Sequence, residues 1–262
     1  MPLTIATWNI NSIRLREGLV VRLLQEEKPD VICLQECKSL VEQIPTDEFA
    51  KLDYKYIIAR GQKAYNGVAI ISKIPLEDAG STDFANLGHA RHVAAKLKSG
   101  ITIHNHYIPA GGDVPDRELN EKFGQKLDYI SELRDSFVKE IPQKSIFVGD
   151  FNIAPFEDDV WSHKQLQKIV SHTPIEIECL LDMQKVGNLV DVVRSNIPNG
   201  KLYSWWSYRA KDWRTTNRGR RLDHIWATKD LAAFTKKSYI VKDVRGWEKP
   251  SDHVPVFTTF DI

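Results

Sequence analysis

The sequence has few cysteines and almost no net charge. Its three cysteines are Cys33, Cys37 and Cys179, and they form neither an even disulfide framework nor a set with metal-site spacing. This usage favours a reducing compartment, and we expect a cytoplasmic protein. The formal net charge is +1, so binding to a polyanion would depend on local groups of Lys and Arg.

Long apolar runs are also missing. No stretch approaches the roughly 18 apolar residues of a membrane span, and the N-terminal residues lack a basic region followed by a long apolar core. We therefore expect no membrane partner. We see no linker, low-complexity tract or heptad pattern, so residues 1–262 are predicted to form a single domain and a monomer.

Residues 145–155, which read SIFVGDFNIAP, carry the clearest local signal. An apolar run followed by turn residues predicts a buried strand that ends abruptly. Asp150 and Asn152 are two residues apart, so both side chains would lie on one face of extended backbone. A carboxylate and a carboxamide held together in this way can bind a cation, a water molecule and a phosphoryl oxygen. The alternative is that both residues only cap a turn.

The remaining chain alternates between strand-like and helical patterns. Ser12 is placed to cap a helix whose apolar face carries Leu15, Leu19, Leu23 and Leu24, within a β-α-β crossover. The strands that we expect are 3–8, 31–34, 67–72, 92–97, 101–106, 203–208, 222–227, 239–244 and 254–260, and the further helices are 119–138, 161–170 and 175–186. These elements predict an α/β fold with hairpin-rich sheets flanked by helices.

Several predicted strands end in the same few polar residue types. Glu36 could be a surface acid, and Asp252 with His253 could belong to a turn. Asp223 lies among apolar neighbours, where a carboxylate needs a partner. His253 is a suitable one, because a carboxylate fixes the imidazole tautomer and favours its protonated form. The full set of strand-end residues is Asn9, Glu36, Tyr107, Asp150, Asn152, Asp223, Asp252 and His253.

Basic and aromatic residues are interleaved between positions 205 and 221. This composition suits a phosphate backbone together with an exposed sugar or base. The alternative is a solvated loop beside core tryptophans. The basic members are Arg209, Lys211, Arg214, Arg218, Arg220 and Arg221, and the tryptophans are Trp205, Trp206 and Trp213.

Short motifs that share one order run from residue 8 to residue 255. They are WNIN (8–11), LQE (34–36), NHYIP (105–109), GDFN (149–152), RLDH (221–224) and SDHVP (251–255). In this order they resemble the motifs of the exonuclease III family, the abasic-site endonucleases of the endonuclease/exonuclease/phosphatase superfamily. The resemblance implies a four-layered α/β sandwich, in which two mixed sheets pack face to face with helices outside.

By this resemblance, the protein would be a Mg²⁺-dependent DNA-repair hydrolase. It would cut duplex DNA on the 5′ side of abasic sites and leave a 3′-hydroxyl, with 3′-to-5′ exonuclease or 3′-phosphodiesterase activity. Its partner would be duplex DNA with abasic or blocked 3′ ends. Glu36 would be the principal ligand of Mg²⁺ or Mn²⁺, which prefer oxygen ligands. The other metal and phosphate ligands would be Asn9, Asp150, Asn152, Asp252 and His253.

The same resemblance implies catalytic roles. Asp150 would orient and deprotonate the attacking water, and Asn152 would fix its geometry. His253, held by Asp223, would contact a non-bridging phosphate oxygen. Tyr107 would either donate a hydrogen bond to the phosphate or carry a proton. Two other readings are a relative that acts on a lipid or inositol phosphate and an inactive nucleic-acid-binding relative.

The implied substrate contacts centre on a small pocket for an extrahelical abasic sugar, with Trp205 and Leu222 on opposite sides. The sequence departs from relatives at Arg220, where the family often has Trp or Leu, and at Ala110 and Asp113. The full set of implied substrate-binding residues is Asn11, Trp205, Arg209, Arg218, Arg220 and Leu222.

Overall fold

The computed structural model describes residues 2–210 and 212–262. One sheet contains β1 (Pro2–Asn9), β2 (Val31–Gln35), β3 (Tyr56–Arg60), β4 (Val68–Ser72), β13 (Thr235–Ile240) and β14 (Val256–Asp261). The other contains β5 (Leu76–Asp78), β6 (His92–Leu97), β7 (Thr102–Tyr107), β8 (Ser145–Asp150), β9 (Leu189–Asp191) and β12 (Asp223–Thr228). A short ribbon pairs β10 (Trp205–Trp206) with β11 (Gly219–Arg220). The helices are α1 (Ile13–Glu27), α2 (Thr46–Ala50), α3 (Glu121–Lys139), α4 (His163–Leu166), α5 (Pro174–Val186), α6 (Val192–Asn196), α7 (Trp213–Thr216) and α8 (Lys229–Ala232).

The two large sheets share one pattern of strand directions. The first has the order β13-β14-β1-β2-β4-β3 and the second the order β5-β6-β7-β8-β12-β9. In each sheet the central pair is parallel, β1 with β2 and β7 with β8, and the outer pairs are antiparallel. Each parallel pair needs a crossover helix, which α1 and α3 supply. The predicted β-α-β unit and the mixed sheets are confirmed.

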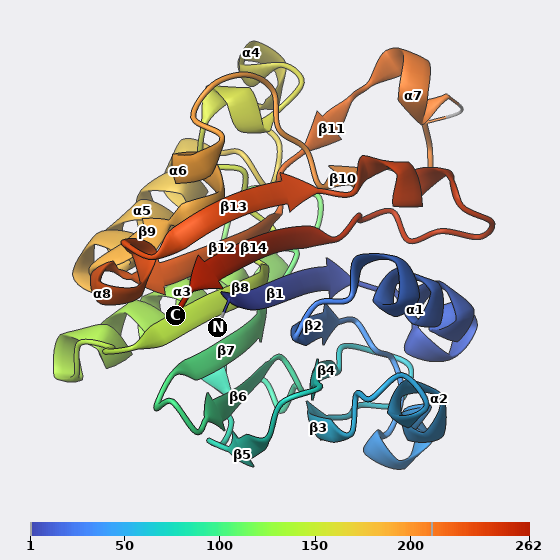
Figure 1. The fold of residues 1–262 in the computed structure, drawn as a ribbon. Helices are drawn as coiled ribbons and strands as arrows, with labels where there is room; N and C mark the ends of the chain where they lie inside the picture. The colour runs from blue at the N-terminus through green and yellow to red at the C-terminus, as the bar shows by residue number, and fades with distance from the viewer. Residues whose placement is uncertain (1, 211) are drawn as a thin grey trace.

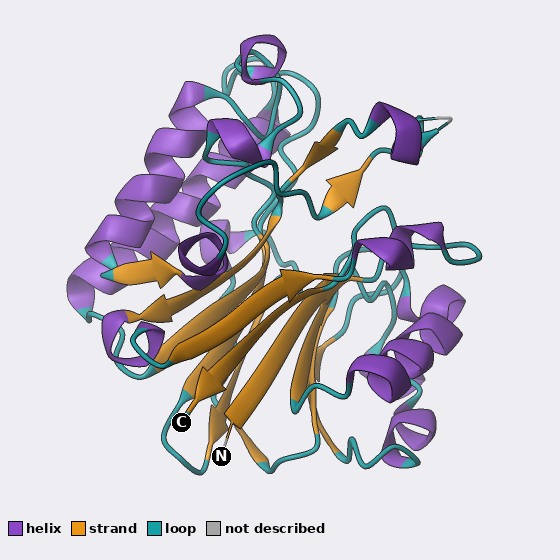
Figure 2. Ribbon diagram, turned by 45° about the horizontal axis from the view of Figure 1, so that its top comes forward, coloured by secondary structure: helices purple, strands orange, loops and turns teal. Residues whose placement is uncertain are grey.

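Helices cover the outer faces of both sheets. Figure 2 shows the strands in the centre with helices on either side, and Figure 1 places α1 and α2 opposite α3 and α5. Buried Val31 and Ile146 belong to the core between the sheets. Trp8 and Phe49 fill the layer under α1 and α2, and Ile130 fills the layer under α3. The predicted four-layered α/β sandwich is confirmed.

The ends of the two parallel pairs meet at one edge of the sandwich. Asn9 ends β1 and donates a hydrogen bond to Asp150, the last residue of β8. Behind this edge, Gln35 Nε2 of β2 donates to Asn105 Oδ1 of β7 at 2.7 Å, across the two sheets. β12 and β14 run antiparallel to their neighbours, so they begin where those strands end. Strand ends of both sheets therefore converge on a single region.

The backbone at these ends adopts conformations that ordinary strand residues avoid. Gly149 has φ 137°, and a Cβ at this position would lie 1.9 Å from the His106 carbonyl oxygen. Only glycine lets β8 approach β7 this closely. Glu36 and Asn152 have φ values of 49° and 55°, in the left-handed region that costs about 1–3 kcal/mol for non-glycine residues. The strands therefore end in strained turns that surrounding contacts must hold.

Most element predictions are confirmed within a few residues. The strand predicted at 203–208 is reduced to the two residues of β10, and three other predictions differ. The strand predicted at 239–244 lies earlier, as β13, because Thr235–Ile240 is an edge strand whose exposed lysines hide the pattern. The helix predicted at 161–170 is reduced to α4. On α1, Leu15 is 62% exposed, and Val20 packs in the core instead.

No helix within the described residues is long and apolar enough to span a lipid bilayer.

Candidate active site

Two carboxylates share one amide nitrogen at the centre of the converging strand ends. Asn9 Nδ2 donates to Glu36 Oε1 and to Asp150 Oδ2, each at 2.8 Å. Asn152 donates to Asp150 through its backbone N at 2.9 Å and its Nδ2 at 3.1 Å. The side-chain oxygen of Asn9, Oδ1, accepts from Asn11 N at 3.1 Å. Asn9 therefore holds the two carboxylates side by side, and its own oxygen is used by the backbone.

A buried ion pair lies beside this centre. His253 Nδ1 donates to Asp223 Oδ2 at 2.8 Å, and His253 Nε2 lies 3.7 Å from Asp150 Oδ2. Burial disfavours the charged imidazole, but the Asp223 and Asp150 carboxylates outweigh it and raise the pKa of His253 to about 10. The partnership predicted from the sequence is present. His253 is therefore a cation whose Nε2–H points toward the carboxylate centre.

Glu36 stays ionised because a lysine lies against it. Burial opposes the charge, but Lys38, whose Nζ lies 2.8 Å from Glu36 Oε2, lowers the pKa of the carboxyl group. Lys38 Nζ also donates to Asn11 Oδ1 at 2.6 Å. Our sequence reasoning missed Lys38, although it stands two residues after Glu36.

The pKa of Asp150 shifts in the direction opposite to that of Glu36. Asp150 is 1% exposed. Burial raises the pKa of Asp150, and the nearby cation His253 only partly offsets this effect. Tyr107 lies close by, and burial, followed by the Glu36 and Asp150 charges, raises the pKa of its phenol well above the usual value. Tyr107 is therefore a neutral hydroxyl that can donate a hydrogen bond.

A cavity of about 680 Å³ opens over these groups. Trp205 and Leu222 both line it, and Trp205 Nε1 donates to Asp252 Oδ2 at 2.9 Å. The Arg220 guanidinium lies 5.2 Å from the centre of the Trp205 ring and donates to Ser171 Oγ at 2.6 Å. The cavity wall thus combines an aromatic face with a cation.

The ribbon of β10 and β11 carries the basic segment beside the cavity, where it projects from the sheets (Figure 1). Arg209 and Arg218 line the cavity, and Arg218 lies over the ring of Trp161. Lys211 is outside the described residues. Arg221 was wrongly included in the basic surface: it is fully buried and paired with Asp159 and Asp191.

Asn11 lies at the margin of this region rather than in the cavity wall. Its Nδ2 donates to Asp252 Oδ1 at 3.2 Å and to the Tyr208 hydroxyl at 3.4 Å. Both Asp252 oxygens are therefore occupied, by Asn11 and by Trp205. The other predicted residues either line the cavity or lie directly beneath it. Lining the cavity are Glu36, Tyr107, Asp150, Asn152, Trp205, Arg209, Arg218, Arg220, Leu222, Asp252 and His253, with Asn9 and Asp223 behind them.

Comparison with known proteins agrees with this geometry. Residues 6–253 match the model of the Endonuclease/Exonuclease/phosphatase family. The chain belongs to this family. It is 30% identical to the Exodeoxyribonuclease III of Haemophilus influenzae, over 97% of this chain and 98% of that protein. It is 28% identical to the Exodeoxyribonuclease of Bacillus subtilis, over 98% of each.

Solved structures of this family have the same fold. An AP endonuclease from Archaeoglobus fulgidus superposes with a TM-score of 0.92 at 33% identity, over 99% of this chain and 100% of that one. The 3′ phosphatase NExo from Neisseria, bound to a product DNA hairpin, superposes with a TM-score of 0.87 at 28% identity, over 99% and 100%. The chain therefore has the metal-dependent phosphodiesterase hydrolase fold of the family.

The donor atoms at the site fit a divalent cation. The ligand atoms of Asp150, Asp223 and His253 all lie within 4.8 Å of one another. Asp223 Oδ1 is buried without a hydrogen-bond partner in the described part of the chain. As a cation, however, His253 has no lone pair for a metal ion. The carboxylate oxygens of Glu36 and Asp150, which both accept from Asn9 Nδ2, are the better ligand pair.

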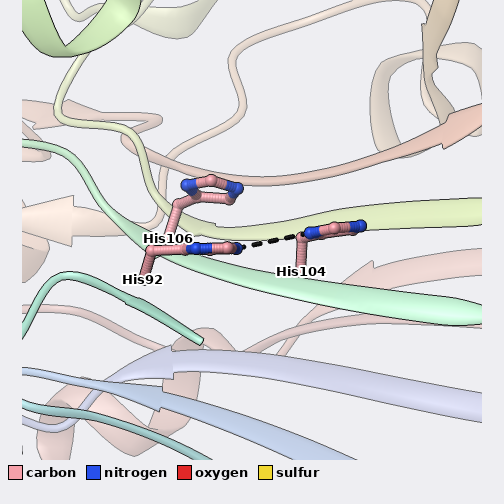
Figure 3. Close-up of side chains that lie close together, drawn as sticks. All are labelled: His92, His104 and His106. Carbon is pink, nitrogen blue, oxygen red and sulfur yellow. Dashed lines mark hydrogen bonds between the residues drawn. The ribbon is translucent and has the colours of Figure 1, made fainter. Parts of the chain in front are cut away.

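A second cluster lies away from the family's site, on β6 and β7. Figure 3 shows His92 and His104 edge to edge, with the His106 ring above His92. His92 Nδ1 accepts from Thr82 N at 3.0 Å, so its Nε2 carries the proton and donates to His104 Nδ1 at 3.3 Å. His106 Nδ1 faces the Tyr129 hydroxyl. The hydrogen bonds commit His92 to a tautomer that cannot bind metal at Nε2, so we treat the cluster as structural.

This histidine cluster should make the protein less stable in acid. Burial lowers the pKa of all three rings, that of His104 to about 4. The unfolded chain binds protons below pH about 6.5, whereas the folded chain resists them, so stability is full above that pH and falls below it. Each proton taken up on unfolding contributes a slope of at most about 1.4 kcal/mol per pH unit.

Urea denaturation between pH 5 and pH 8 measures this slope. His253 has a raised pKa and acts in the opposite sense, so the cluster is assessed by comparing the parent protein with the His104→Gln variant. We expect a shallower loss of stability in the variant. Equal slopes for the two proteins would contradict the assignment.

Proposed function

We propose that the protein is a Mg²⁺-dependent phosphodiesterase of DNA repair. It would cut duplex DNA on the 5′ side of abasic sites, leave a 3′-hydroxyl, and also process blocked 3′ ends or remove nucleotides from the 3′ end. The observation that carries this proposal is the meeting of the carboxylates Glu36 and Asp150 with the cation His253 beside a tryptophan-lined cavity. The names of the similar proteins support the substrate class.

The cation would be held by Glu36 and Asp150. Hard carboxylate oxygens suit Mg²⁺, and Mn²⁺ accepts the same ligands. When bound, the ion would neutralise charge on the phosphate and stabilise the departing 3′-oxygen. Asn9 would keep the two carboxylates at the spacing that the ion requires, through the hydrogen bonds of its Nδ2.

Side chains of the protein would accept the proton of the attacking water and stabilise the negative charge on the phosphate. Asp150 would accept a proton from the attacking water, and its raised pKa makes it a better base near neutral pH. Asn152, hydrogen-bonded to Asp150, would fix the position of that water. His253 would donate its Nε2–H to a non-bridging phosphate oxygen, with Asp223 holding the ring. Tyr107 would donate a second hydrogen bond to the phosphate.

The cavity would receive the abasic sugar, with Trp205 and Leu222 against its carbon face. Arg209 and Arg218 would contact phosphates on either side of the lesion. Arg220 adds a cation where relatives often have an apolar residue, which would favour a polar or charged occupant. We propose that one domain, residues 1–262, does this work as a monomer. Its free cysteines fit a reducing compartment such as the cytoplasm.

Incision of a duplex with one abasic analogue tests the function. The duplex is incubated with the protein in Mg²⁺ or in chelator, and an undamaged duplex and one with a 3′-phosphate serve as comparisons. We expect incision next to the analogue that depends on the metal. Binding without incision would indicate an inactive relative, and neither binding nor incision would indicate a different phosphodiester.

Salt should weaken DNA binding steeply. Each phosphate that an arginine neutralises contributes a slope of about −0.9 in a plot of log affinity against log salt. Arg209→Ala and Arg218→Ala should each reduce the slope by about one such step, as fluorescence anisotropy in Ca²⁺ would measure. Lys185→Ala, an exposed residue on α5, is the control. A slope that neither arginine variant changes would remove both residues from the interface.

A further inference from the structure

The segment that follows Asp150 is held by side chains at three successive carbonyl oxygens. Lys126 Nζ donates to Asn152 O at 2.8 Å, and His224 Nε2 donates to Ile153 O at 2.8 Å. His172 Nδ1 donates to Ala154 O at 2.6 Å. The three donors come from α3, from β12 and from the turn before α5. We call these three residues the carbonyl clamp.

The clamped segment has little regular structure of its own. Phe151 N donates to Leu222 O and Ala154 N donates to Ser171 O, each at 2.8 Å. Asn152 between them is in the left-handed region, with φ 55°. A non-glycine residue keeps that conformation only where its surroundings impose it. The clamp supplies such surroundings.

Lys126 is the most constrained member of the clamp. Its side chain is fully buried and forms an ion pair with Glu176, which is also fully buried. Its other hydrogen bonds go to Asn152 O and to Ala110 O, the latter at 3.3 Å. All three ammonium protons are therefore used. Lys126 ties the turn after β7, which follows Tyr107, to the turn after β8.

Glu176 anchors the lysine rather than the site. Its carboxylate accepts from Ser171 N at 2.9 Å and from Thr173 Oγ1 at 2.6 Å. A buried ammonium without such a counter-charge costs several kcal/mol. The pair therefore fixes the lysine where its remaining protons can reach the two turns.

We infer that Lys126 is a positioning residue for catalysis, acting with His224 through the main chain of residues 152–153. By holding the Asn152 carbonyl, it sets the Asn152 carboxamide, whose Nδ2 reaches Asp150 Oδ2 and Ile108 O. The effect on rate rests on the proposed function, whereas the effect on the main chain does not. Lys126 touches none of the reacting atoms, so its loss should reduce kcat and leave DNA binding unchanged.

The test uses the Lys126→Met/Glu176→Gln variant, which removes both charges together and keeps the side-chain volumes. We expect kcat on the abasic duplex to fall by about 10²-fold, the effect of a misplacement of about 1 Å, while KM stays within about twofold. Amide hydrogen exchange in residues 150–154 should become faster. Lys139→Met, an exposed position on the same helix, is the control and should match the parent.

A second pair of variants guards against a failure of the double variant to fold. His224→Gln keeps an amide donor close to where Nε2 lies, and His224→Leu removes it. We expect the leucine variant to lose rate and exchange protection, and the glutamine variant to recover most of both. Unchanged kcat and unchanged exchange in the folded variants would overturn the inference. If the parent cuts no DNA, the proposed function fails, and exchange still decides whether the clamp holds the segment.

Discussion

Replacing Asp150 with asparagine should lower kcat on an abasic duplex by about 10²–10⁴-fold, the usual contribution of a general base. Asparagine keeps the size of the side chain but cannot accept a proton from water. Its single oxygen also accepts only part of the hydrogen bonds that the two Asp150 oxygens receive from Asn9 and Asn152. Burial raises the pKa of Asp150, so the ionised form is costly to the fold. Steady-state incision in Mg²⁺ measures the loss.

The stability of this variant separates chemistry from folding. At pH 8 asparagine removes a charge that burial disfavours, but it also loses accepted hydrogen bonds, and the two effects on stability oppose each other. We therefore expect the variant to stay folded and to unfold within a few degrees of the parent. Asp113→Asn removes an exposed carboxylate from the lining of the same cavity and is the matched control, with kcat close to the parent value. Near-normal turnover of Asp150→Asn would refute the role assigned to this carboxylate.

Replacing His253 with alanine should lower kcat by about 10²–10³-fold, as expected for loss of a charged donor to the phosphoryl oxygens. The alanine variant also leaves Asp223 buried without its cation. A loss of stability of about 3–5 kcal/mol should therefore accompany the loss of rate. Single-turnover incision and thermal denaturation measure the two effects separately.

Two further substitutions identify what His253 supplies. His253→Gln keeps a donor near the position of Nε2 without the charge, and it should restore part of the rate. Asp223→Asn keeps the ring in place and removes the counter-charge that raises the pKa of His253. We expect it to lower kcat less than His253→Ala. A His253→Ala variant with nearly parental rate would contradict the role of the imidazolium.

Much of this site could be predicted because its residues stand at strand ends. Asp223 among apolar neighbours needed a partner, and the structure supplies His253 at 2.8 Å. Asp150 and Asn152 come together and both border the cavity. The backbone between them is a turn, however, with Asn152 at φ 55° and its N donating to Asp150 Oδ1, so the expected extended backbone is not what joins them. The order of the motifs supplied the rest, including the two mixed sheets.

Other features could not be predicted, because their meaning depends on partners far away in the sequence. Arg221 reads as one more surface cation, yet its carboxylate partners Asp159 and Asp191 stand 62 and 30 residues before it. Lys126 reads as a solvent-facing residue of an amphipathic helix. Its partner Glu176 stands 50 residues later. Short edge strands such as β5 lack a pattern of their own, since pairing with β6 defines them.

The meeting of two sheets at one edge has a consequence for how activity arises during folding. Asn9 and Glu36 arrive with one sheet, and Asp150 and Asp223 arrive with the other. A chain in which only one half has formed holds at most one of the two carboxylates that Asn9 joins. When the protein is diluted from denaturant, nuclease activity should therefore return late, at the same time as the two sheets dock. Partly folded chains would leave DNA intact.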